Sequence, residues 1–131
     1  MTESKKILVV DDEEHVVAAI KTNLEVEGYR VLPAYSGQEA LELVGREKPD
    51  LIVLDVMMPE MDGWEVLDRL KAQEQTAEIP VVMLTALSQD EDIIRGWEGG
   101  AHAYLTKPFD PAKLVRIIGE QLALQEKRQA R

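Results

Sequence analysis

The chain has 131 residues and contains no cysteine. Disulfide bonds, zinc sites built from thiolates and cysteine nucleophiles are therefore all excluded. A domain of this length buries roughly 65–70% of the surface of its unfolded chain, so a hydrophobic core can stabilise it without cross-links. The absence of cysteine also suits a reducing compartment.

The sequence also lacks long hydrophobic runs and an excess of basic residues. No apolar segment reaches the roughly 18 residues that a membrane span needs, and the polar start "MTESKK" does not fit a secretory signal peptide. The formal net charge is −10, and such a surface repels the phosphates of nucleic acids. We therefore predict a cytoplasmic protein that binds neither membranes nor nucleic acids directly. The excess of acid favours solubility and also suits a divalent cation.

Short apolar runs alternate with amphipathic segments along the whole chain. The predicted strands are Lys6–Val10, Arg30–Ala34, Leu51–Asp55, Pro80–Ala86 and Ala103–Thr106. Each is followed by apolar residues at helical spacing. The first, third and fourth strands are almost entirely apolar, as in strands that are covered on both faces, while Pro33 indicates an edge strand. The pattern predicts an α/β fold with three layers, a doubly wound parallel sheet between helices.

Capping residues mark the starts of three predicted helices. Ser36 and Ser88 each begin a capping box, and Asp110 precedes a proline at the first helical position. No linker or repeat interrupts the pattern. We expect one domain over residues 1–125, with residues 126–131 as a loose tail or the start of a linker.

Polar residues follow the predicted strands at the point where each strand ends. They are Asp11 and Asp12 after the first strand, Asp55 at the end of the third, Thr85 in the fourth and Lys107 after the fifth. Open parallel sheets bind ligands at the carboxyl ends of their strands, so we expect these side chains to lie together. Helix capping, a turn or a solvated lysine would explain each residue alone. The combination indicates a functional site.

The residue types at these strand ends suit phosphoryl chemistry. Converging carboxylates need either a proton or a cation to offset their repulsion. Mg²⁺ accepts a few carboxylate oxygens and leaves room for phosphate oxygens. An aspartate can attack a phosphoryl group to give an aspartyl phosphate, whose oxygens Thr85 and Lys107 could bind. We expect the strand to carry Asp55 to the rim of the sheet rather than bury it.

Four stretches carry a resemblance to a known family: "ILVVDDE", "PDLIVLDVMMPEMDG", "PVVMLTA" and "GAHAYLTKPF". Over about residues 5–124 the sequence resembles the response-regulator receiver domain, the CheY-like phospho-accepting module of two-component signalling. The resemblance implies a flavodoxin-like fold with a five-stranded sheet in the order 2-1-3-4-5. It also implies that a sensor histidine kinase or a phosphotransfer protein donates the phosphoryl group.

The resemblance assigns roles to individual residues. Asp55 is the expected phosphorylation site. Mg²⁺, which Mn²⁺ can replace, is expected to be held by Asp11, Asp12, Asp55 and the backbone carbonyl of Met57. The expected switch residue is Thr85, whose hydroxyl moves toward the phosphoryl group.

Three further positions match the switch and phosphate-binding parts of the family. Tyr104 matches the aromatic switch residue, which turns inward when the threonine moves. Lys107 matches the lysine that binds the phosphoryl group, and its peptide bond to Pro108 is expected to be cis. The face formed by the helix expected from Ser88, the strand 103–106 and the last helix is then expected to change and to be read by partners.

The resemblance leaves alternatives for the protein as a whole. It is expected to be either a stand-alone regulator that acts on a downstream protein or the receiver part of a longer regulator with an output domain. His102 and Ala103 stand where many DNA-binding regulators have an acidic pair that supports dimers, so we expect a monomer or a weak dimer. A receiver-like scaffold that acts without phosphorylation is the alternative function. The resemblance implies a signalling domain that is not an enzyme beyond its own phosphorylation and dephosphorylation.

Two apolar residues flank the expected site, and Trp64 is expected near the loop that follows Asp55. Met57 and Leu87, two positions beyond Asp55 and Thr85, offer no side chain to orient an attacking water. We therefore predict slow self-dephosphorylation. Trp64 and Trp97 are expected mainly to fill the core.

Overall fold

The computed structural model describes residues 4–86 and 100–130 of the chain. Five parallel strands form one sheet in the order β2-β1-β3-β4-β5. Their bounds are Lys6–Val10 (β1), Arg30–Ala34 (β2), Leu51–Asp55 (β3), Val81–Thr85 (β4) and Ala103–Thr106 (β5). The predicted α/β class and strand order are confirmed, and β2 with its Pro33 lies at an edge.

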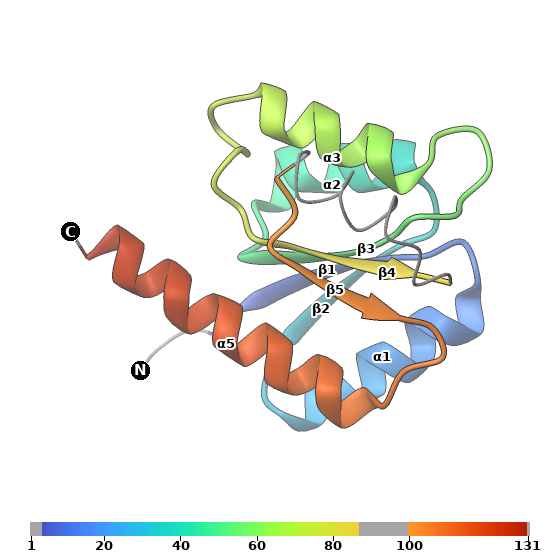
Figure 1. Cartoon of the computed structure of the whole chain (residues 1–131), viewed down its shortest axis with the longest axis horizontal. Helices are drawn as coiled ribbons and strands as arrows, with labels where there is room; N and C mark the ends of the chain where they lie inside the picture. The colour runs from blue at the N-terminus through green and yellow to red at the C-terminus, as the bar shows by residue number, and fades with distance from the viewer. Residues whose placement is uncertain (1–3, 87–99, 131) are drawn as a thin grey trace.

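Helices cover both faces of the sheet and complete three layers. The described helices are Glu14–Val26 (α1), Gly37–Glu47 (α2), Gly63–Ala72 (α3) and Pro111–Gln129 (α5). Figure 1 shows α2 and α3 on one face and α1 and α5 on the other. None of these described helices is long and apolar enough to cross a bilayer. The helix expected from Ser88, with Trp97, lies outside the described residues.

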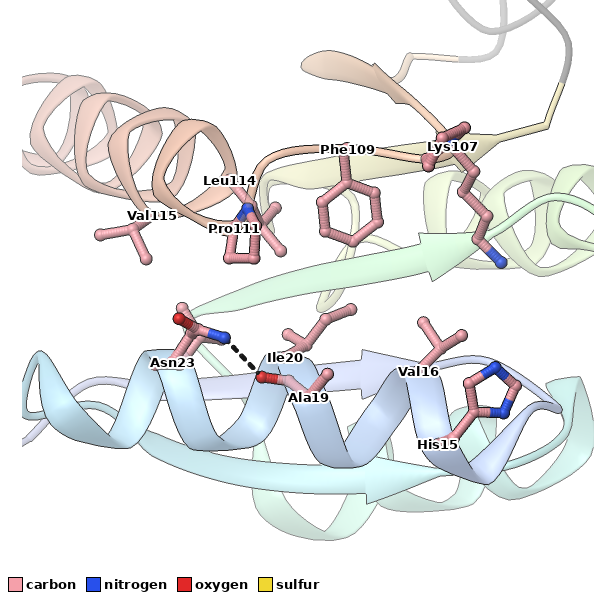
Figure 2. Close-up of a pocket in the computed structure, with 12 residues that line it drawn as sticks. His15, Val16, Ala19, Ile20, Asn23, Lys107, Phe109, Pro111, Leu114 and Val115 are labelled. Atoms are coloured by element: carbon pink, nitrogen blue, oxygen red, sulfur yellow. Dashed lines mark hydrogen bonds between the residues drawn. The ribbon is translucent and has the colours of Figure 1, made fainter.

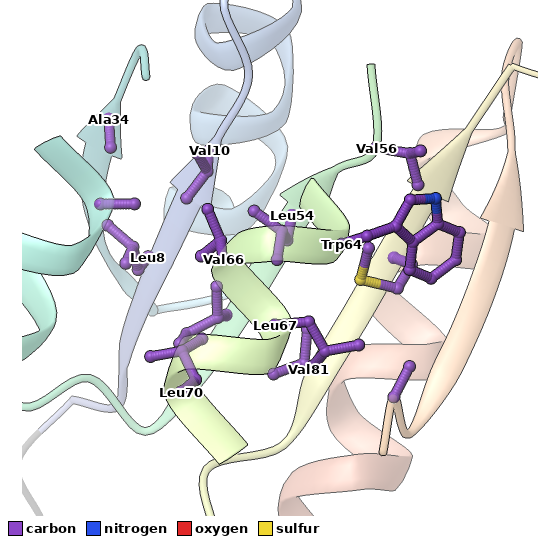
Figure 3. Close-up of a cluster of buried hydrophobic side chains, with 14 of the residues drawn as sticks. Leu8, Val10, Ala34, Leu54, Val56, Trp64, Val66, Leu67, Leu70 and Val81 are labelled. Carbon is purple, nitrogen blue, oxygen red and sulfur yellow. The ribbon is translucent and has the colours of Figure 1, made fainter. Parts of the chain in front are cut away.

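Each face of the sheet buries its own apolar cluster. Alternate residues of β1 divide between the two, because successive side chains of a strand point to opposite faces. Leu8 and Val10 pack with residues of α2 and α3, among which Trp64 is buried (Figure 3). Ile7 and Val9 pack with residues of α1 and α5. Burial on both sides explains why the central strands lack apolar–polar alternation.

Side-chain caps hold the starts of three described helices. Ser36 at α2 and Asp110 at α5 accept hydrogen bonds from backbone N–H groups of the first turn, as their positions predicted. Asp62 does the same at the start of α3. Such caps satisfy N–H groups that have no partner within the helix.

The last helix is longer than predicted. Residues 126–129 were expected to be loose, but α5 continues through Gln129. Gln125 is only 8% exposed, and its side chain donates a 2.9 Å hydrogen bond to the carbonyl of Glu78. Arg128 donates in turn to Gln125. These contacts hold the end of α5 against the segment before β4. The domain boundary at residue 125 stays a prediction.

The chain folds back tightly after β3, and Gly63 makes this turn possible. Its backbone N–H donates a 2.9 Å hydrogen bond to the carbonyl of Val56. A Cβ atom at Gly63 would collide with the carbonyl oxygen of Asp55 and lie 2.9 Å from the Cα of Val56. The loop that follows Asp55 is therefore packed against the end of its own strand.

We predict that Gly63→Ala lowers the free energy of unfolding by on the order of 2 kcal/mol, because the backbone must shift to admit the methyl group. Urea unfolding followed by circular dichroism measures it. Gly45→Ala is the matched control, since a Cβ there meets nothing within 4 Å and alanine in an exposed helix stabilises by about 0.5–1 kcal/mol. Equal stability of the two variants would contradict the close packing at Gly63.

Candidate functional site

The sheet itself brings three charged residues together. Asp55 continues the alternation of Leu51 and Val53, which face the layer of α1 and α5. Asp11 and Lys107 directly follow β1 and β5, and their backbone N–H groups still donate to carbonyls at the ends of the neighbouring strands. The three residues therefore lie at the carboxyl edge of the sheet, as predicted for a parallel fold.

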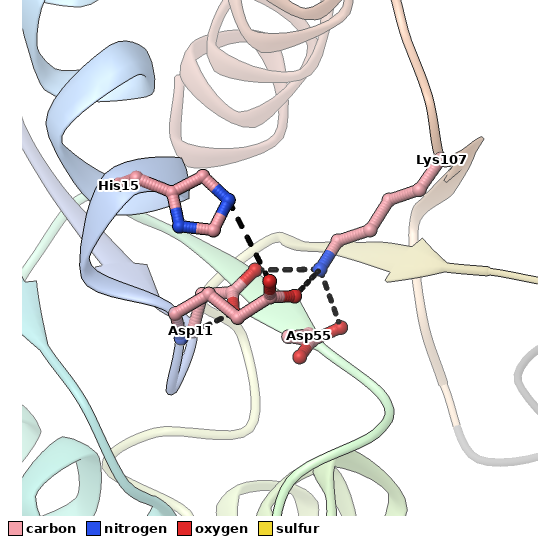
Figure 4. A network of polar contacts seen from close by, with 5 residues as sticks. Asp11, His15, Asp55 and Lys107 are labelled. Carbon is pink, nitrogen blue, oxygen red and sulfur yellow. Dashed lines mark hydrogen bonds and ion pairs between the residues drawn. The ribbon is translucent and has the colours of Figure 1, made fainter.

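One ammonium group lies among three carboxylates (Figure 4). The Nζ atom of Lys107 is 2.7 Å from Oδ2 of Asp11 and 3.2 Å from Oδ1 of Asp55. It is also 3.9 Å from Oε1 of Glu13. Asp11 is fully buried, and a buried carboxylate requires a paired, hydrogen-bonded partner. Lys107 supplies that partner and bridges the ends of β1 and β3.

The acids also form a cluster of oxygen ligands. One carboxylate oxygen from each of Asp11, Asp12 and Asp55 lies within 4.8 Å of the others. Asp12 is exposed while the other two are buried. A few hard oxygen donors with one open side fit Mg²⁺, which keeps several waters and binds phosphate oxygens. Met57 follows in the loop after β3 and is 70% exposed, and the role of its carbonyl stays a prediction.

Asp55 is more buried than the sequence indicated. We expected the residue at the rim of the sheet, but its side chain is only 4% exposed. The reason is the tight return of the chain, in which Val56 bonds to the β4 carbonyl of Leu84 and Gly63 packs on the end of β3. Asp55 is thus at the edge of the sheet but enclosed by the loop that follows it.

This enclosure changes the acidity of the site. Burial and the charge of Asp11 raise the pKa of the Asp55 carboxyl from 3.8 to about 6, although Lys107 acts in the opposite direction. Burial lowers the pKa of Lys107, but its hydrogen bond with Asp11 and the charge of Asp55 outweigh it and leave this pKa above its ordinary value. Lys107 therefore stays charged at neutral pH, and the negative charge of Asp55 is less stable than that of a free aspartate.

Thr85 and Tyr104 belong to the other face of the sheet. Thr85 continues the alternation of Val81 and Met83, which face α2 and α3, and it is buried. Tyr104 pairs in register with Met83 and packs against the same cluster. Burial raises the pKa of the Tyr104 hydroxyl to about 12, so the group is neutral at physiological pH. The two predicted switch residues are thus on neighbouring strands and the same face.

The peptide bond between Lys107 and Pro108 is cis, the isomer that the resemblance implied. The same segment borders a second feature, an apolar cavity of about 400 Å³ between α1 and α5. Figure 2 shows Val16, Ile20 and Phe109 along its walls, with Lys107 at one end. The Lys107 side chain therefore lines one end of this cavity, while its ammonium group contacts the acid cluster.

Sequence reasoning assigned no role to Glu13, which the structure places at the site. Glu13 contacts Lys107, and its second carboxylate oxygen is 3.6 Å from Nε2 of His15. The signal in the sequence was the third acid in "DDEE", but an exposed acid at a helix start has an ordinary explanation in the helix dipole. Only the fold shows that Lys107, 94 positions away in the chain, approaches it.

Comparisons with known proteins agree with this geometry. The family model of the response regulator receiver domain matches residues 7–119. The alkaline phosphatase synthesis transcriptional regulatory protein PhoP of Bacillus subtilis is 50% identical over 111 residues, which are 85% of this chain and 45% of that protein. The DNA-binding dual master transcriptional regulator RpaA of Synechocystis is 46% identical over 113 residues, 86% of this chain and 47% of that protein. The chain spans about half the length of these curated relatives.

Solved structures show the same similarity over the whole domain. A CheY-like response regulator receiver domain protein from Methanospirillum hungatei has a TM-score of 0.89 at 33% identity, covering 95% of this chain and 98% of that chain. The chemotaxis protein CheY4 of Vibrio cholerae has a TM-score of 0.85 at 33% identity, covering 89% of this chain and 98% of that chain. The likeness therefore extends over nearly all of the fold, the sheet together with its helices.

We predict that Asp55→Asn stabilises the metal-free protein at pH 7.5, because it removes a buried charge beside Asp11. Above pH 6 Asp55 is charged in both the folded and unfolded states, so the whole free-energy cost of burying this charge opposes folding. As the pH falls from about 6 to 4, the folded state takes up the proton first, so the opposition fades. The gain is on the order of 2 kcal/mol at pH 7.5 and much smaller at pH 4.5.

Urea unfolding at both pH values in the presence of a chelator measures this effect. Asp68→Asn, on the exposed face of α3, is the control and should change stability little at either pH. A gain for Asp55→Asn that does not depend on pH would contradict the raised pKa of this carboxyl.

Proposed function

The chain belongs to the response regulator receiver domain family of two-component signalling, and we propose that it accepts a phosphoryl group on Asp55 in a Mg²⁺-dependent reaction. The observation that carries the proposal is the convergence of Asp11, Asp55 and Lys107 at the carboxyl edge of the sheet. In such a domain this chemistry serves signalling rather than metabolism, so we regard the protein as a phosphorylatable regulator and not as an enzyme.

The reaction we propose is a transfer from a phosphohistidine. A carboxylate oxygen of Asp55 attacks phosphorus, and the phosphorus–nitrogen bond breaks with its electron pair going to the imidazole, which then takes up a proton. Lys107, 3.2 Å from Asp55, is placed to pair with the transferred phosphoryl oxygens. Mg²⁺ held by Asp11, Asp12, Asp55 and the Met57 carbonyl would offset the negative charge that develops on those oxygens.

The response to phosphorylation is proposed to pass through Thr85 and Tyr104. The new group has about −2 charge and three acceptor oxygens, so it attracts the Thr85 hydroxyl as well as Lys107. Movement of Thr85 at the end of β4 would give Tyr104, on the adjacent strand, space to turn inward. Partners would then read the face of β5, α5 and the helix expected from Ser88, which itself lies outside the described residues.

The proposed partners are a sensor histidine kinase or a phosphotransfer protein as donor, and either a downstream protein or an attached output domain as target. Both named relatives are described as transcriptional regulators. At the position of the acidic pair in many DNA-binding regulators, the His102 ring accepts a hydrogen bond from Val81. Burial, with the charges of Lys71 and Arg128, lowers the His102 pKa to about 4. A neutral His102 that is already hydrogen-bonded cannot take the place of that acidic pair between two copies. We therefore propose a monomer or weak dimer.

We predict that incubation with acetyl phosphate and Mg²⁺ adds the mass of one phosphoryl group, detected by intact mass spectrometry. Asp55→Asn should abolish the gain and EDTA should prevent it, because the nucleophile and the cation are both required. Asp68→Asn should be phosphorylated like the unchanged chain. No gain, with histidine kinases also tried, would favour the scaffold that acts without phosphorylation.

A second prediction concerns the lifetime of the phosphoryl group. Met57 is exposed and apolar, so its side chain cannot orient a water for attack on phosphorus; Leu87, the other flanking residue, lies outside the described residues. We expect self-dephosphorylation to be slow, and Met57→Asn to accelerate it by supplying an amide that binds water. Loss of the phosphoryl mass over time in Mg²⁺ measures both rates. A half-life of a few seconds for the unchanged chain would contradict the prediction.

A further inference from the structure

Glu13 occupies the N-cap position of α1 but does not cap it. Its backbone carbonyl accepts hydrogen bonds from the first turn, whereas its side chain makes no cap hydrogen bond. Glutamate is not a favoured N-cap residue. The Glu13 carboxylate lies instead 3.9 Å from Nζ of Lys107 and 3.6 Å from Nε2 of His15. Helix capping therefore does not account for an acid at this position.

The backbone of Glu13 is anchored to the charged residues of the site. Its backbone N–H donates a 2.9 Å hydrogen bond to Oδ1 of the buried Asp11, which in turn binds Lys107. The Glu13 side chain is 53% exposed, whereas those of Asp11 and Asp55 are almost fully buried. Glu13 is thus an acid at the mouth of the site that is not one of the proposed metal ligands.

The charges around Lys107 make this position important for an incoming anion. Three acids, Asp11, Glu13 and Asp55, lie within 4 Å of one ammonium group, and Asp12 adds a fourth carboxylate to the cluster. A divalent cation in the site would still leave an excess of negative charge. The exposed carboxylate of Glu13 is part of this excess on the solvent side. A phosphorylated donor must bring further negative charge past this carboxylate. The energy of such an approach depends on the charge of the donor and on salt.

We infer that Glu13 is a specificity-determining residue that disfavours small, highly charged phosphodonors at Asp55. The inference rests on the proposed phosphoryl acceptance and adds which donors the site admits. A free dianionic acyl phosphate meets the repulsion of Glu13 fully. A donor with a lower charge meets less of it. The residue therefore limits adventitious phosphorylation by metabolites of the acyl phosphate class.

The test compares two small donors that differ in charge. Acetyl phosphate is a dianion at neutral pH, whereas phosphoramidate carries one net negative charge. At saturating Mg²⁺ and low ionic strength, Glu13→Gln should raise the second-order rate constant for acetyl phosphate by roughly two- to fivefold. The rise for phosphoramidate should be smaller, and added salt should reduce both. Glu13→Asp, which retains the charge, should remain near the unchanged chain.

Glu14→Gln is the matched control for this experiment. Glu14 is the adjacent acid at the start of α1 and is also exposed, but among the described residues it forms no ion pair with Lys107. The Glu14→Gln variant should leave the preference between acetyl phosphate and phosphoramidate unchanged. An equal rise for both donors in Glu13→Gln, or the same change in Glu14→Gln, would overturn the inference.

A binding measurement separates this inference from the proposed function. Inorganic phosphate, titrated in Mg²⁺ buffer and followed by amide chemical shifts near Lys107, should bind about two- to fivefold more tightly to Glu13→Gln than to Glu14→Gln. If this holds while no variant is phosphorylated, the phosphoryl-transfer proposal fails and the charge discrimination stands. Equal phosphate affinity of the two variants would overturn the role of Glu13 even if Asp55 is phosphorylated.

Discussion

The ion pair between Lys107 and Asp11 is the interaction on which the site depends. It joins the residues that directly follow β1 and β5, which are not neighbours in the sheet, and it reaches across β4 and across β3, where Asp55 lies. A buried carboxylate without a counter-charge would destabilise the edge of the sheet, since breaking such a pair typically costs about 3–5 kcal/mol. The electrostatics that hold this edge together therefore also aim an ammonium group at Asp55, the proposed nucleophile.

The two faces of the sheet carry different kinds of site residue. The side chains that continue toward the α1–α5 layer, Asp11, Asp55 and Lys107, carry the charges. The side chains that continue toward the α2–α3 layer, Thr85 and Tyr104, are neutral. Because strand alternation separates the two sets, the proposed response to phosphorylation would have to pass from the charged set to the neutral set at the end of β4, where Thr85 lies.

Much of this architecture could be predicted from the sequence because local patterns determine it. Apolar runs set the strands, and the residues after them had to meet at one edge. What escaped prediction depends on contacts between distant segments. Asp55 is enclosed because the chain returns to pack Gly63 against the end of β3. The last turn of α5 is held because Gln125 donates a hydrogen bond to the carbonyl of Glu78. The contact of Glu13 with Lys107 is likewise non-local, and the cis bond was implied by family resemblance, not by physical reasoning.

Pro33 in the edge strand β2 has a consequence for association between copies. The N–H of Arg30 donates to the carbonyl of Lys5, so in a parallel ladder the N–H groups of Leu32 and Ala34 also face β1. The position of Pro33 therefore faces outward, where a further strand would need a donor that proline does not have. Growth of the sheet at this edge is disfavoured. On this side of the sheet, contacts with another molecule are left to side chains and the adjoining loops, and strand-by-strand aggregation of the domain through β2 is disfavoured.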